Sequence, residues 1–314
     1  MGRRASQYAG FEIETPVERD ALGGYLKIVC FASLLAIMQK TTVIAGLEVY
    51  THTTDAFADS TKPIYAVFFL HGRMGSAQSD YMQKITAEIL SSPAARSESK
   101  DLMIVTFDHR NHGTRLKDRL YNLSFEENPN HALDMYTIQL GTAKDVSFLI
   151  DFLPSYLFPL GERTISDWGV TGISLGGHSA YIAGASDPRL KLTIPIIGCP
   201  DYLALMYPRA KEAGLNAGPP YLPDSFVEQV KRDSLLSLPY TSEGPENPFY
   251  GKHVLVLSGG ADPLVPWTAS KPFVEGLQVG PGSKEFIVFD GVGHDVPPPM
   301  VAALIKSLVS FVNV

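Results

Sequence analysis

Short apolar runs alternate along this chain with segments of helical spacing. The run Ile64–Leu70 is apolar throughout and short for a helix, so it suits a strand buried on both faces of a sheet. The runs that predict strands cover residues 47–53, 64–70, 102–108, 167–173, 192–197, 252–258 and 284–290. The segments that predict helices cover residues 79–91, 135–152, 175–185, 267–277 and 300–312. This alternation predicts an α/β fold with a mostly parallel sheet and helices on both faces.

The alternation breaks between residues 201 and 250. Two helices are predicted there, over 202–213 and 224–235, and a Gly-Pro-Pro segment at 218–220 joins them. The break therefore indicates an insertion in a single α/β domain that covers residues 47–314.

The first 46 residues form an N-terminal extension whose structure the sequence leaves uncertain. An apolar run at 28–38 is too short to span a bilayer, and it suits either an extra helix over the sheet edge or an early strand. Acidic residues precede this run, which is not typical of a signal peptide. We expect a cytoplasmic protein with no stable membrane span.

Composition and charge exclude some classes of protein and of binding partner. The 314 residues are 45% hydrophobic and 19% charged, which is typical of a globular domain with one substantial core. The net charge of −7 argues against nucleic acid as a partner. The chain has two cysteines, and its eight histidines show no metal-binding spacing, so we expect neither a metal nor a cofactor. A homodimer is left open.

The most informative motif is Gly-Ile-Ser-Leu-Gly-Gly at 172–177, between a predicted strand and a predicted helix. A serine on a sharp strand-to-helix turn needs small residues two positions before and after it, and Gly172 and Gly176 occupy these positions. The turn places the Ser174 hydroxyl above the sheet, beside the N-terminus of the helix. Ser174 is therefore a candidate nucleophile.

Two further residues follow predicted strands in the order that such a nucleophile requires. Asp262 follows the strand at 252–258, and His294 follows the strand at 284–290 within Gly-Val-Gly-His. Functional groups in open α/β sheets gather at the carboxyl ends of strands. The order serine, aspartate, histidine predicts a catalytic triad of Ser174, Asp262 and His294.

The glycine-rich segment His-Gly-Arg-Met-Gly at 71–75 leaves a central strand and can direct a backbone N–H group at a developing oxyanion. We expect the amides of Arg73 and Leu175 to form this oxyanion hole. The Arg73 side chain has two readings of equal weight: it lines the pocket and attracts a carboxylate or phosphate of the substrate, or it forms a structural ion pair.

From about residue 47 to the C-terminus the chain resembles the α/β-hydrolases. The elbow at 172–177, the His-Gly loop and the segment 262–266 carry this resemblance. The stretch 172–200 is most similar to dienelactone hydrolases and prolyl-oligopeptidase-like esterases. The resemblance implies a small helical cap at about 201–250, inserted before the acid-bearing strand. It also makes Asp201 an alternative triad acid, because some members of the superfamily take the acid from the strand before the cap.

The resemblance extends to two other regions. The turn at 108–113 resembles the family's Asp-x-Arg-x-x-Gly turn, in which an arginine bonds loop carbonyls and holds the His71 loop. The cap carries Tyr202, Met206 and Tyr207 as candidates for the substrate pocket, although packing of the cap onto the core is the commoner role for any one such residue.

Together these features predict a serine hydrolase that cleaves a carboxylic ester, lactone or thioester of a small to medium molecule through an acyl-enzyme on Ser174. An acyltransferase, a cyclase or a carbon–carbon bond hydrolase could use the same triad. A non-catalytic ligand-binding protein of this fold is a further alternative, since fold alone does not determine function.

Overall fold

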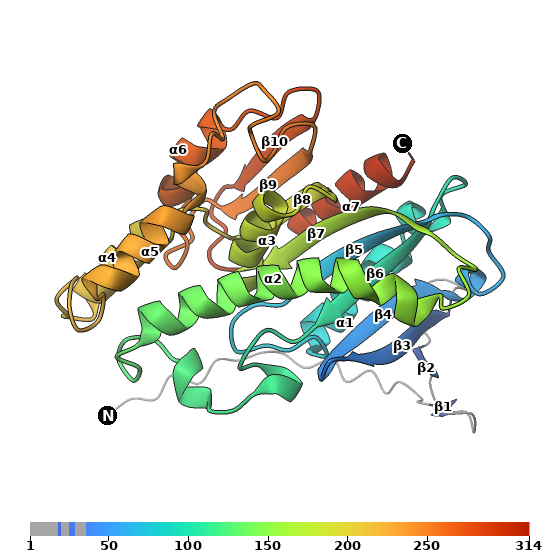
Figure 1. Cartoon of the computed structure of the whole chain (residues 1–314), viewed down its shortest axis with the longest axis horizontal. Coiled ribbons are helices and arrows are strands. Elements are labelled where there is room, and N and C mark those ends of the chain that lie inside the picture. The colour runs from blue at the N-terminus through green and yellow to red at the C-terminus, as the bar shows by residue number, and fades with distance from the viewer. Residues whose placement is uncertain (1–17, 20–24, 29–35, 314) are drawn as a thin grey trace.

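The computed structural model describes residues 18–19, 25–28 and 36–313, and these residues build one ten-stranded sheet flanked by helices (Figure 1). The strands are β1 (Glu18–Arg19), β2 (Tyr25–Ile28), β3 (Ile37–Ile44), β4 (Leu47–Thr54), β5 (Ile64–Leu70), β6 (Asp101–Phe107), β7 (Ile165–Ile173), β8 (Leu190–Ile196), β9 (His253–Gly259) and β10 (Ser283–Phe289). The helices are α1 (Asp80–Leu90), α2 (His131–Leu157), α3 (Leu175–Ser186), α4 (Tyr202–Glu212), α5 (Asp224–Asp233), α6 (Trp267–Gly276) and α7 (Pro298–Val312).

The spatial order of the strands is β1-β2-β3-β4-β6-β5-β7-β8-β9-β10. Strands β1 to β4 pair antiparallel, and β4 pairs antiparallel with β6. From β6 to β10 every pairing is parallel. The mostly parallel sheet predicted from the alternation of apolar runs is therefore confirmed.

Alternate residues of the central strand β5 face opposite layers of helices. Tyr65, Val67 and Phe69 contribute to a core with α1 and α7. Ala66 and Phe68 contribute to a second core with α2 and α3 on the other face. Because both faces of β5 are covered, all seven of its residues are buried, which explains its unbroken apolar sequence.

The seven strands and five helices predicted for the α/β framework are present, most with ends shifted by one or two residues. The main difference is α2, which begins four residues earlier and ends five later than predicted. Pro154 lies within its last turn, where a proline removes one N–H donor without breaking the preceding turns.

Part of the predicted N-terminal extension joins the sheet. Residues 37–44 form β3, which pairs antiparallel with β4 through a two-residue hairpin of Ala45 and Gly46. Both hairpin residues have positive φ, at 49° and 81°, as a tight turn between antiparallel strands requires. The rest of the apolar run at 28–38, apart from Ile28 and 36–38, lies outside the described residues, as do 1–17 and 20–24.

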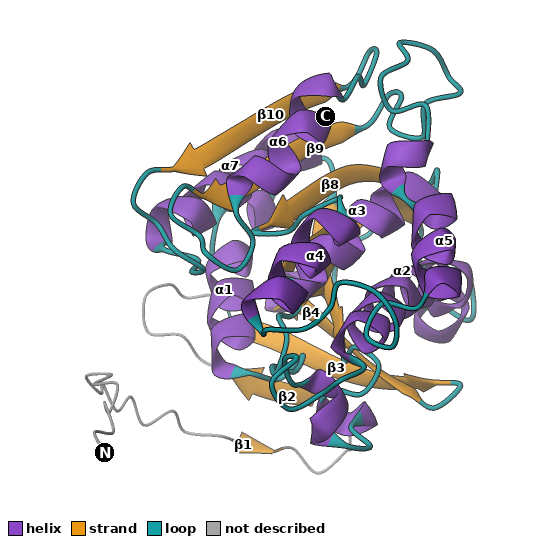
Figure 2. Ribbon diagram, turned by 90° about the vertical axis from the view of Figure 1, so that its left-hand side faces the viewer, coloured by secondary structure: helices purple, strands orange, loops and turns teal. Residues whose placement is uncertain are grey.

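Helices α4 and α5 occupy the segment where the βα alternation breaks, and they lie over the end of the molecule that carries the start of α3 (Figure 2). Their apolar residues share a cluster with Met135 and Tyr136 of α2 and with Leu175 of α3. The insertion is thus packed against the amino-terminal half of α2. None of the helices in the described ranges combines the length and hydrophobicity needed to cross a bilayer.

Candidate active site

Ser174 occupies the turn between β7 and α3 in a strained backbone conformation, with φ of 55° and ψ of −109°. A Cβ atom on Gly172 would lie 2.4 Å from the carbonyl oxygen of Gly176. A Cβ atom on Gly176 would lie 2.2 Å from the carbonyl oxygen of Leu70. Only glycine fits at either position, so the sequence spacing reflects a real packing requirement of the turn.

The structure brings the three predicted triad residues together. The Nε2 atom of His294 lies 2.8 Å from the Ser174 hydroxyl oxygen, and its Nδ1 atom lies 2.8 Å from Oδ2 of Asp262. Ser174 and His294 are 120 positions apart in the sequence, and Asp262 and His294 are 32 positions apart. The three residues lie on loops at the carboxyl ends of β7, β9 and β10. Because Asp262 can only accept, His294 donates from Nδ1 and is free to accept the serine proton at Nε2.

Asp262 is held on the side away from the histidine. Its Oδ1 atom accepts the backbone N–H groups of Leu264 and Val265, each at 2.9 Å. Burial by itself would raise the pKa of Asp262, but the hydrogen bonds from His294 and from these two amides outweigh it and lower the pKa below its ordinary value. The carboxylate is therefore charged and fixed in orientation.

Asp201, the alternative triad acid, has a different position and role. Its Oδ1 atom accepts the backbone N–H of Ala204 at 3.0 Å, so it caps the N-terminus of α4. The side chain that faces His294 is Asp262, and no hydrogen bond or ion pair joins Asp201 to His294 within the described part of the chain.

Two residues are expected to supply the oxyanion hole: Leu175 follows the serine in the chain, and Arg73 follows Gly72, which packs against the serine. Leu175 is the first residue of α3, whose N-terminus carries a partial positive charge. The loop after β5 packs against the serine from the other side, since a Cβ on Gly72 would lie 3.8 Å from the Cβ of Ser174. Across the described ranges, neither the Arg73 nor the Leu175 amide donates a hydrogen bond to the protein, so both are available to a ligand.

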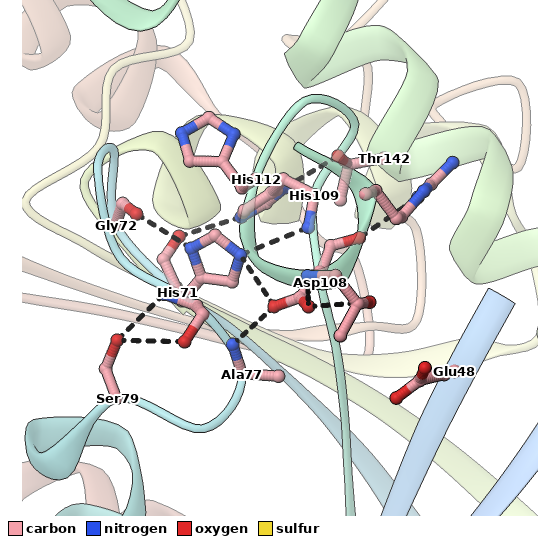
Figure 3. A network of polar contacts seen from close by, with 12 residues as sticks. Glu48, His71, Gly72, Ala77, Ser79, Asp108, His109, His112 and Thr142 are labelled. Atoms are coloured by element: carbon pink, nitrogen blue, oxygen red, sulfur yellow. Dashed lines mark hydrogen bonds and ion pairs between the residues drawn. The ribbon is translucent and has the colours of Figure 1, made fainter. Parts of the chain in front are cut away.

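A buried network fixes the loop that carries Arg73 (Figure 3). His71 donates from Nδ1 to the carbonyl of Gly72 at 2.8 Å and accepts the backbone N–H of His109 at Nε2. His109 in turn donates from Nε2 to the carbonyl of His71 at 2.8 Å. Asp108 accepts the amide of Ala77 at 2.7 Å, so the loop is held at both of its ends.

The turn at 108–113 does support the His71 loop, but not through its arginine. Arg110 is half-exposed and pairs with Asp145 of α2 at 3.0 Å. Asp108 and His109 make the contacts with the loop instead, because their side chains point into the core. The role expected for Arg110 from the family resemblance is therefore wrong.

Burial of several histidines makes stability depend on pH. Burial lowers the pKa of His52, His71, His131 and His178 to about 4, from an ordinary value of 6.5. Below pH 6.5 the unfolded chain binds protons at these sites that the folded protein does not bind, so stability falls as the pH falls toward 4.

We expect the free energy of unfolding to decrease by about 1 kcal/mol for each of these histidines between pH 7 and pH 5.5. Urea unfolding at the two pH values measures it. Carboxylates with ordinary pKa values hardly titrate in this window, so they contribute little to the difference. Equal stability at both pH values would contradict the buried, neutral assignment.

Tyr81 of α1 supports the same loop from the cavity side. Its hydroxyl oxygen accepts the backbone N–H of Gly72 at 2.7 Å. A Cβ on Gly75 would lie 2.7 Å from this hydroxyl, so the glycine allows the contact. Burial raises the pKa of Tyr81 to about 12, so the phenol stays protonated.

Replacing Tyr81 by phenylalanine leaves the Gly72 amide without its partner, next to the Arg73 amide. We expect kcat/KM for an ester to fall roughly 3- to 10-fold, in line with the loss of one hydrogen bond. Steady-state hydrolysis of p-nitrophenyl esters measures the effect. Tyr156→Phe, on an exposed position of α2, is the matched control and should leave kcat/KM unchanged. Identical kcat/KM values for the two variants would contradict a role of Tyr81 in the active site.

A cavity of about 640 Å³ opens above Ser174 and His294. Arg73 lines it, as the sequence predicts for one of its two readings. Tyr202 and Met206 do not line it, because both are buried in the cluster between α4 and α2, and Tyr202 donates its hydroxyl to the carbonyl of Ala132. Tyr207 is exposed and lies in a separate groove between α4 and α5.

The cavity is lined instead by residues that no sequence motif marks as candidates. They come from the end of α4, the start of α2 and α1: Arg209, Glu212, His131, Met135, Gln139 and Tyr81. No local motif marks them, since their place at the cavity depends on how α2 and α4 cross the molecule. Among the described residues, no group of three or more His, Cys, Asp or Glu side chains could hold a metal ion.

Comparison with known proteins gives matches in structure but not in sequence. No protein-family model matches the chain, and no curated protein matches it. TT1662 from Thermus thermophilus has a TM-score of 0.61 at 19% identity, covering 88% of this chain and 99% of that one. A cold-adapted esterase from an Arctic intertidal metagenomic library has a TM-score of 0.55 at 14% identity, covering 94% and 96%. A protein of Klebsiella pneumoniae assigned as a dienelactone hydrolase has a TM-score of 0.55 at 14% identity, covering 88% and 98%.

Proposed function

The chain has the α/β-hydrolase fold that its motifs predicted, and on this premise we propose that it is a serine hydrolase acting on a carboxylic ester, lactone or thioester of small to medium size. The observation that carries the proposal is the continuous contact from Ser174 through His294 to Asp262, at 2.8 Å in each step. A serine is a weak nucleophile until a base takes its proton, and this arrangement supplies such a base.

In the first half of the reaction, His294 removes the proton from Ser174 as the hydroxyl oxygen attacks the carbonyl carbon. Asp262 keeps the imidazole in the tautomer that accepts at Nε2 and stabilises its positive charge. His294 then gives the proton to the leaving alcohol or thiol, and an acyl-enzyme remains on Ser174. Water, activated by the same histidine, releases the acid in the second half.

The amides of Arg73 and Leu175 stabilise the negative charge that develops on the carbonyl oxygen of the substrate. Each such donor contributes roughly 3 kcal/mol to stabilisation of the transition state. The network around His71 and the contact from Tyr81 hold the first amide in place before the reaction starts. Preorganised donors do not need to reorient as charge develops, which is the source of their effect.

The functions of the structural neighbours agree with this proposal. One is an esterase, one is assigned as a dienelactone hydrolase, and an acetyl xylan esterase from Paenibacillus sp. R4 is also similar, with a TM-score of 0.53 at 16% identity over 95% of this chain and 88% of that one. The substrates named for these neighbours apply to those proteins and not to this chain. For this chain, the contacts among Ser174, His294 and Asp262 support attack of the serine on a carbonyl carbon.

A fluorophosphonate probe tests the proposal, together with p-nitrophenyl esters of increasing acyl length. We expect covalent labelling of Ser174, located by mass spectrometry, and ester turnover whose dependence on chain length reflects the 640 Å³ cavity. Labelling without turnover would favour an acyltransferase, a cyclase or a carbon–carbon bond hydrolase. No labelling of the folded protein would contradict an activated serine and favour a ligand-binding role.

A further inference from the structure

The first half of α2 presents one face to the cavity above Ser174. His131, Met135 and Gln139 line the cavity, and their spacing of four residues places them on the same side of the helix. His131 and Gln139 are 2% and 4% exposed, so protein encloses both almost completely. Their backbone positions lie about 12 Å apart along the helix axis, so the two side chains reach different parts of a bound molecule.

His131 carries a hydrogen-bond acceptor that no described residue uses. Its Nδ1 atom donates to the carbonyl of Leu123 at 2.7 Å, since a carbonyl oxygen only accepts. Burial lowers the pKa of His131 to about 4, so the ring is neutral near pH 7 and its Nε2 atom holds a lone pair. An enclosed acceptor is costly to leave without a donor, and a ligand that donates to it removes this cost.

His178 of α3 adds a donor to the same cavity, where it is 6% exposed. The backbone N–H of Cys199 lies 2.8 Å from Nδ1 of His178. The carbonyl of Cys199 is also near this atom, at 3.0 Å, but an N–H group can only donate, so Nδ1 is assigned as the acceptor. Burial lowers the pKa of His178 to about 4, so the ring is neutral and its proton lies on Nε2.

Gln139 completes the set with an amide that can both donate and accept. Within the described ranges, neither this amide nor Nε2 of His178 has a hydrogen-bond partner in the protein. Three enclosed and uncharged side chains therefore offer free hydrogen-bonding atoms to a ligand.

The remaining lining separates these neutral groups from the charged ones. Apolar side chains close to the triad residues in sequence complete the walls: Ile173, Val265 and Val296. The charged side chains of the lining are exposed, apart from the half-buried Arg209: Arg73, Glu126, Glu212 and Asp295. Arg209 donates to the carbonyl of Leu264 at 2.6 Å. A few fixed polar groups among apolar walls are what orient a ligand in a pocket.

We propose that His131, Gln139 and His178 bind hydroxyl groups of the substrate, so that the ester, lactone or thioester carries an uncharged, hydroxylated portion beyond the bond that is cleaved. The inference rests on the proposed function for the identity of that bond. A hydroxyl group donates to Nε2 of His131 and accepts from Nε2 of His178, whereas a carboxylate only accepts and an ammonium only donates. A site built for a hydroxyl rejects the analogue that lacks it, because its own buried groups are then left unpaired.

Ester pairs in which methyl groups replace hydroxyl groups test this preference. p-Nitrophenyl 6-hydroxyhexanoate and p-nitrophenyl heptanoate differ on the acyl side, and 2,3-dihydroxypropyl butyrate and 2-methylbutyl butyrate differ on the alcohol side. We expect the hydroxylated ester of one pair to have a kcat/KM roughly tenfold or more above its partner, which identifies the side of the hydroxyl site. Methyl analogues that react at least as fast in both pairs would overturn the inference. So would a higher kcat/KM for p-nitrophenyl 6-aminohexanoate than for the 6-hydroxy ester.

Substitutions at His131 separate the roles of its two nitrogen atoms. In His131→Asn the side-chain NH₂ group takes the place of Nδ1 and keeps the contact with Leu123, but the acceptor at Nε2 is lost. In His131→Gln the longer amide supplies an acceptor near the Nε2 position. We expect the ratio of hydroxylated to methyl kcat/KM to fall roughly tenfold in His131→Asn and to be largely retained in His131→Gln. An effect on folding slows both substrates, and the ratio cancels it.

Two further variants complete this comparison. Gln139→Met keeps the length of the side chain without its amide and should lower the same ratio. Lys144→Met, at an exposed position of α2, is the matched control and should leave the ratio unchanged. An unchanged ratio in both His131→Asn and Gln139→Met would contradict the hydroxyl site.

A binding measurement separates this inference from the proposed reaction. Calorimetry of methyl 6-hydroxyhexanoate, methyl heptanoate and the two butyrates with the Ser174→Ala protein measures recognition without turnover. We expect the hydroxylated member of one pair to bind at least tenfold more tightly, and this difference to be lost in the Ser174→Ala, His131→Asn double variant. Selective binding by a protein with no hydrolase activity would contradict only the proposed function. Hydrolysis without selective binding would contradict only the hydroxyl site.

Discussion

Replacing Ser174 by alanine is expected to lower kcat for ester hydrolysis by roughly 10⁴-fold or more and to abolish fluorophosphonate labelling. The change removes the nucleophile that His294 contacts at 2.8 Å, and no covalent intermediate can then form. Residual hydrolysis above the uncatalysed rate should persist, because the oxyanion donors and the binding cavity remain. The rate of p-nitrophenyl ester hydrolysis under saturating substrate measures the effect.

Loss of folding must be separated from loss of chemistry in this variant. Ser174 has a positive φ of 55°, which alanine tolerates about as poorly as serine, whereas glycine adopts it readily. Ser174→Gly is therefore the control: it should be as inactive as Ser174→Ala and at least as stable in thermal unfolding. Activity within tenfold of the wild type in either folded variant would rule out Ser174 as the nucleophile.

Replacing Asp262 by asparagine is expected to lower kcat/KM by roughly 10⁴-fold while the site keeps its shape. The amides of Leu264 and Val265 require an acceptor at the Oδ1 position, so the asparagine oxygen should stay there. Its NH₂ group then faces Nδ1 of His294 and forces that atom to accept. The imidazole would carry its proton on Nε2 and could no longer take the proton of Ser174.

Asp201→Asn is the matched control for this prediction. Asp201 caps α4 through the amide of Ala204, and asparagine caps helices about as well as aspartate. We expect unchanged kcat/KM and a change in stability below about 1 kcal/mol. If Asp262→Asn remained fully active and Asp201→Asn lost activity, the acid would have to be assigned to Asp201.

Much of the framework follows from the sequence because the signals are local. A run such as Ile64–Leu70 is apolar at every position only when both faces of a strand are covered. The glycines at 172 and 176 form a short motif at a fixed spacing, so the elbow and its serine can be predicted although Gly176 makes room for the distant Leu70 carbonyl. The order of Ser174, Asp262 and His294 then follows from the strands that precede them.

Other features could not be predicted because they depend on contacts between distant segments. The hairpin that joins β3 to β4 uses Ala45 and Gly46, a pair with a weak turn signature, so the sequence does not predict β3. Tyr202 and Met206 lie one turn apart on α4 and were both plausible pocket residues. The packing of α4 on α2 directs both side chains into the core instead. Only that packing decides that Arg209, later on the same helix, enters the cavity.

The sequence by itself determined the α/β framework, the nucleophile elbow and the order of the reacting groups, because each is encoded in periodicity or in a short motif of fixed spacing. The tertiary structure decided which acid meets His294, which side chains hold the oxyanion loop, and what charge lines the cavity. These depend on residues far apart in the chain that only folding joins, such as Asp262 and His294, 32 positions apart, and His71 and His109, 38 positions apart. Contacts of that kind leave no local pattern, since either partner would look the same without the other.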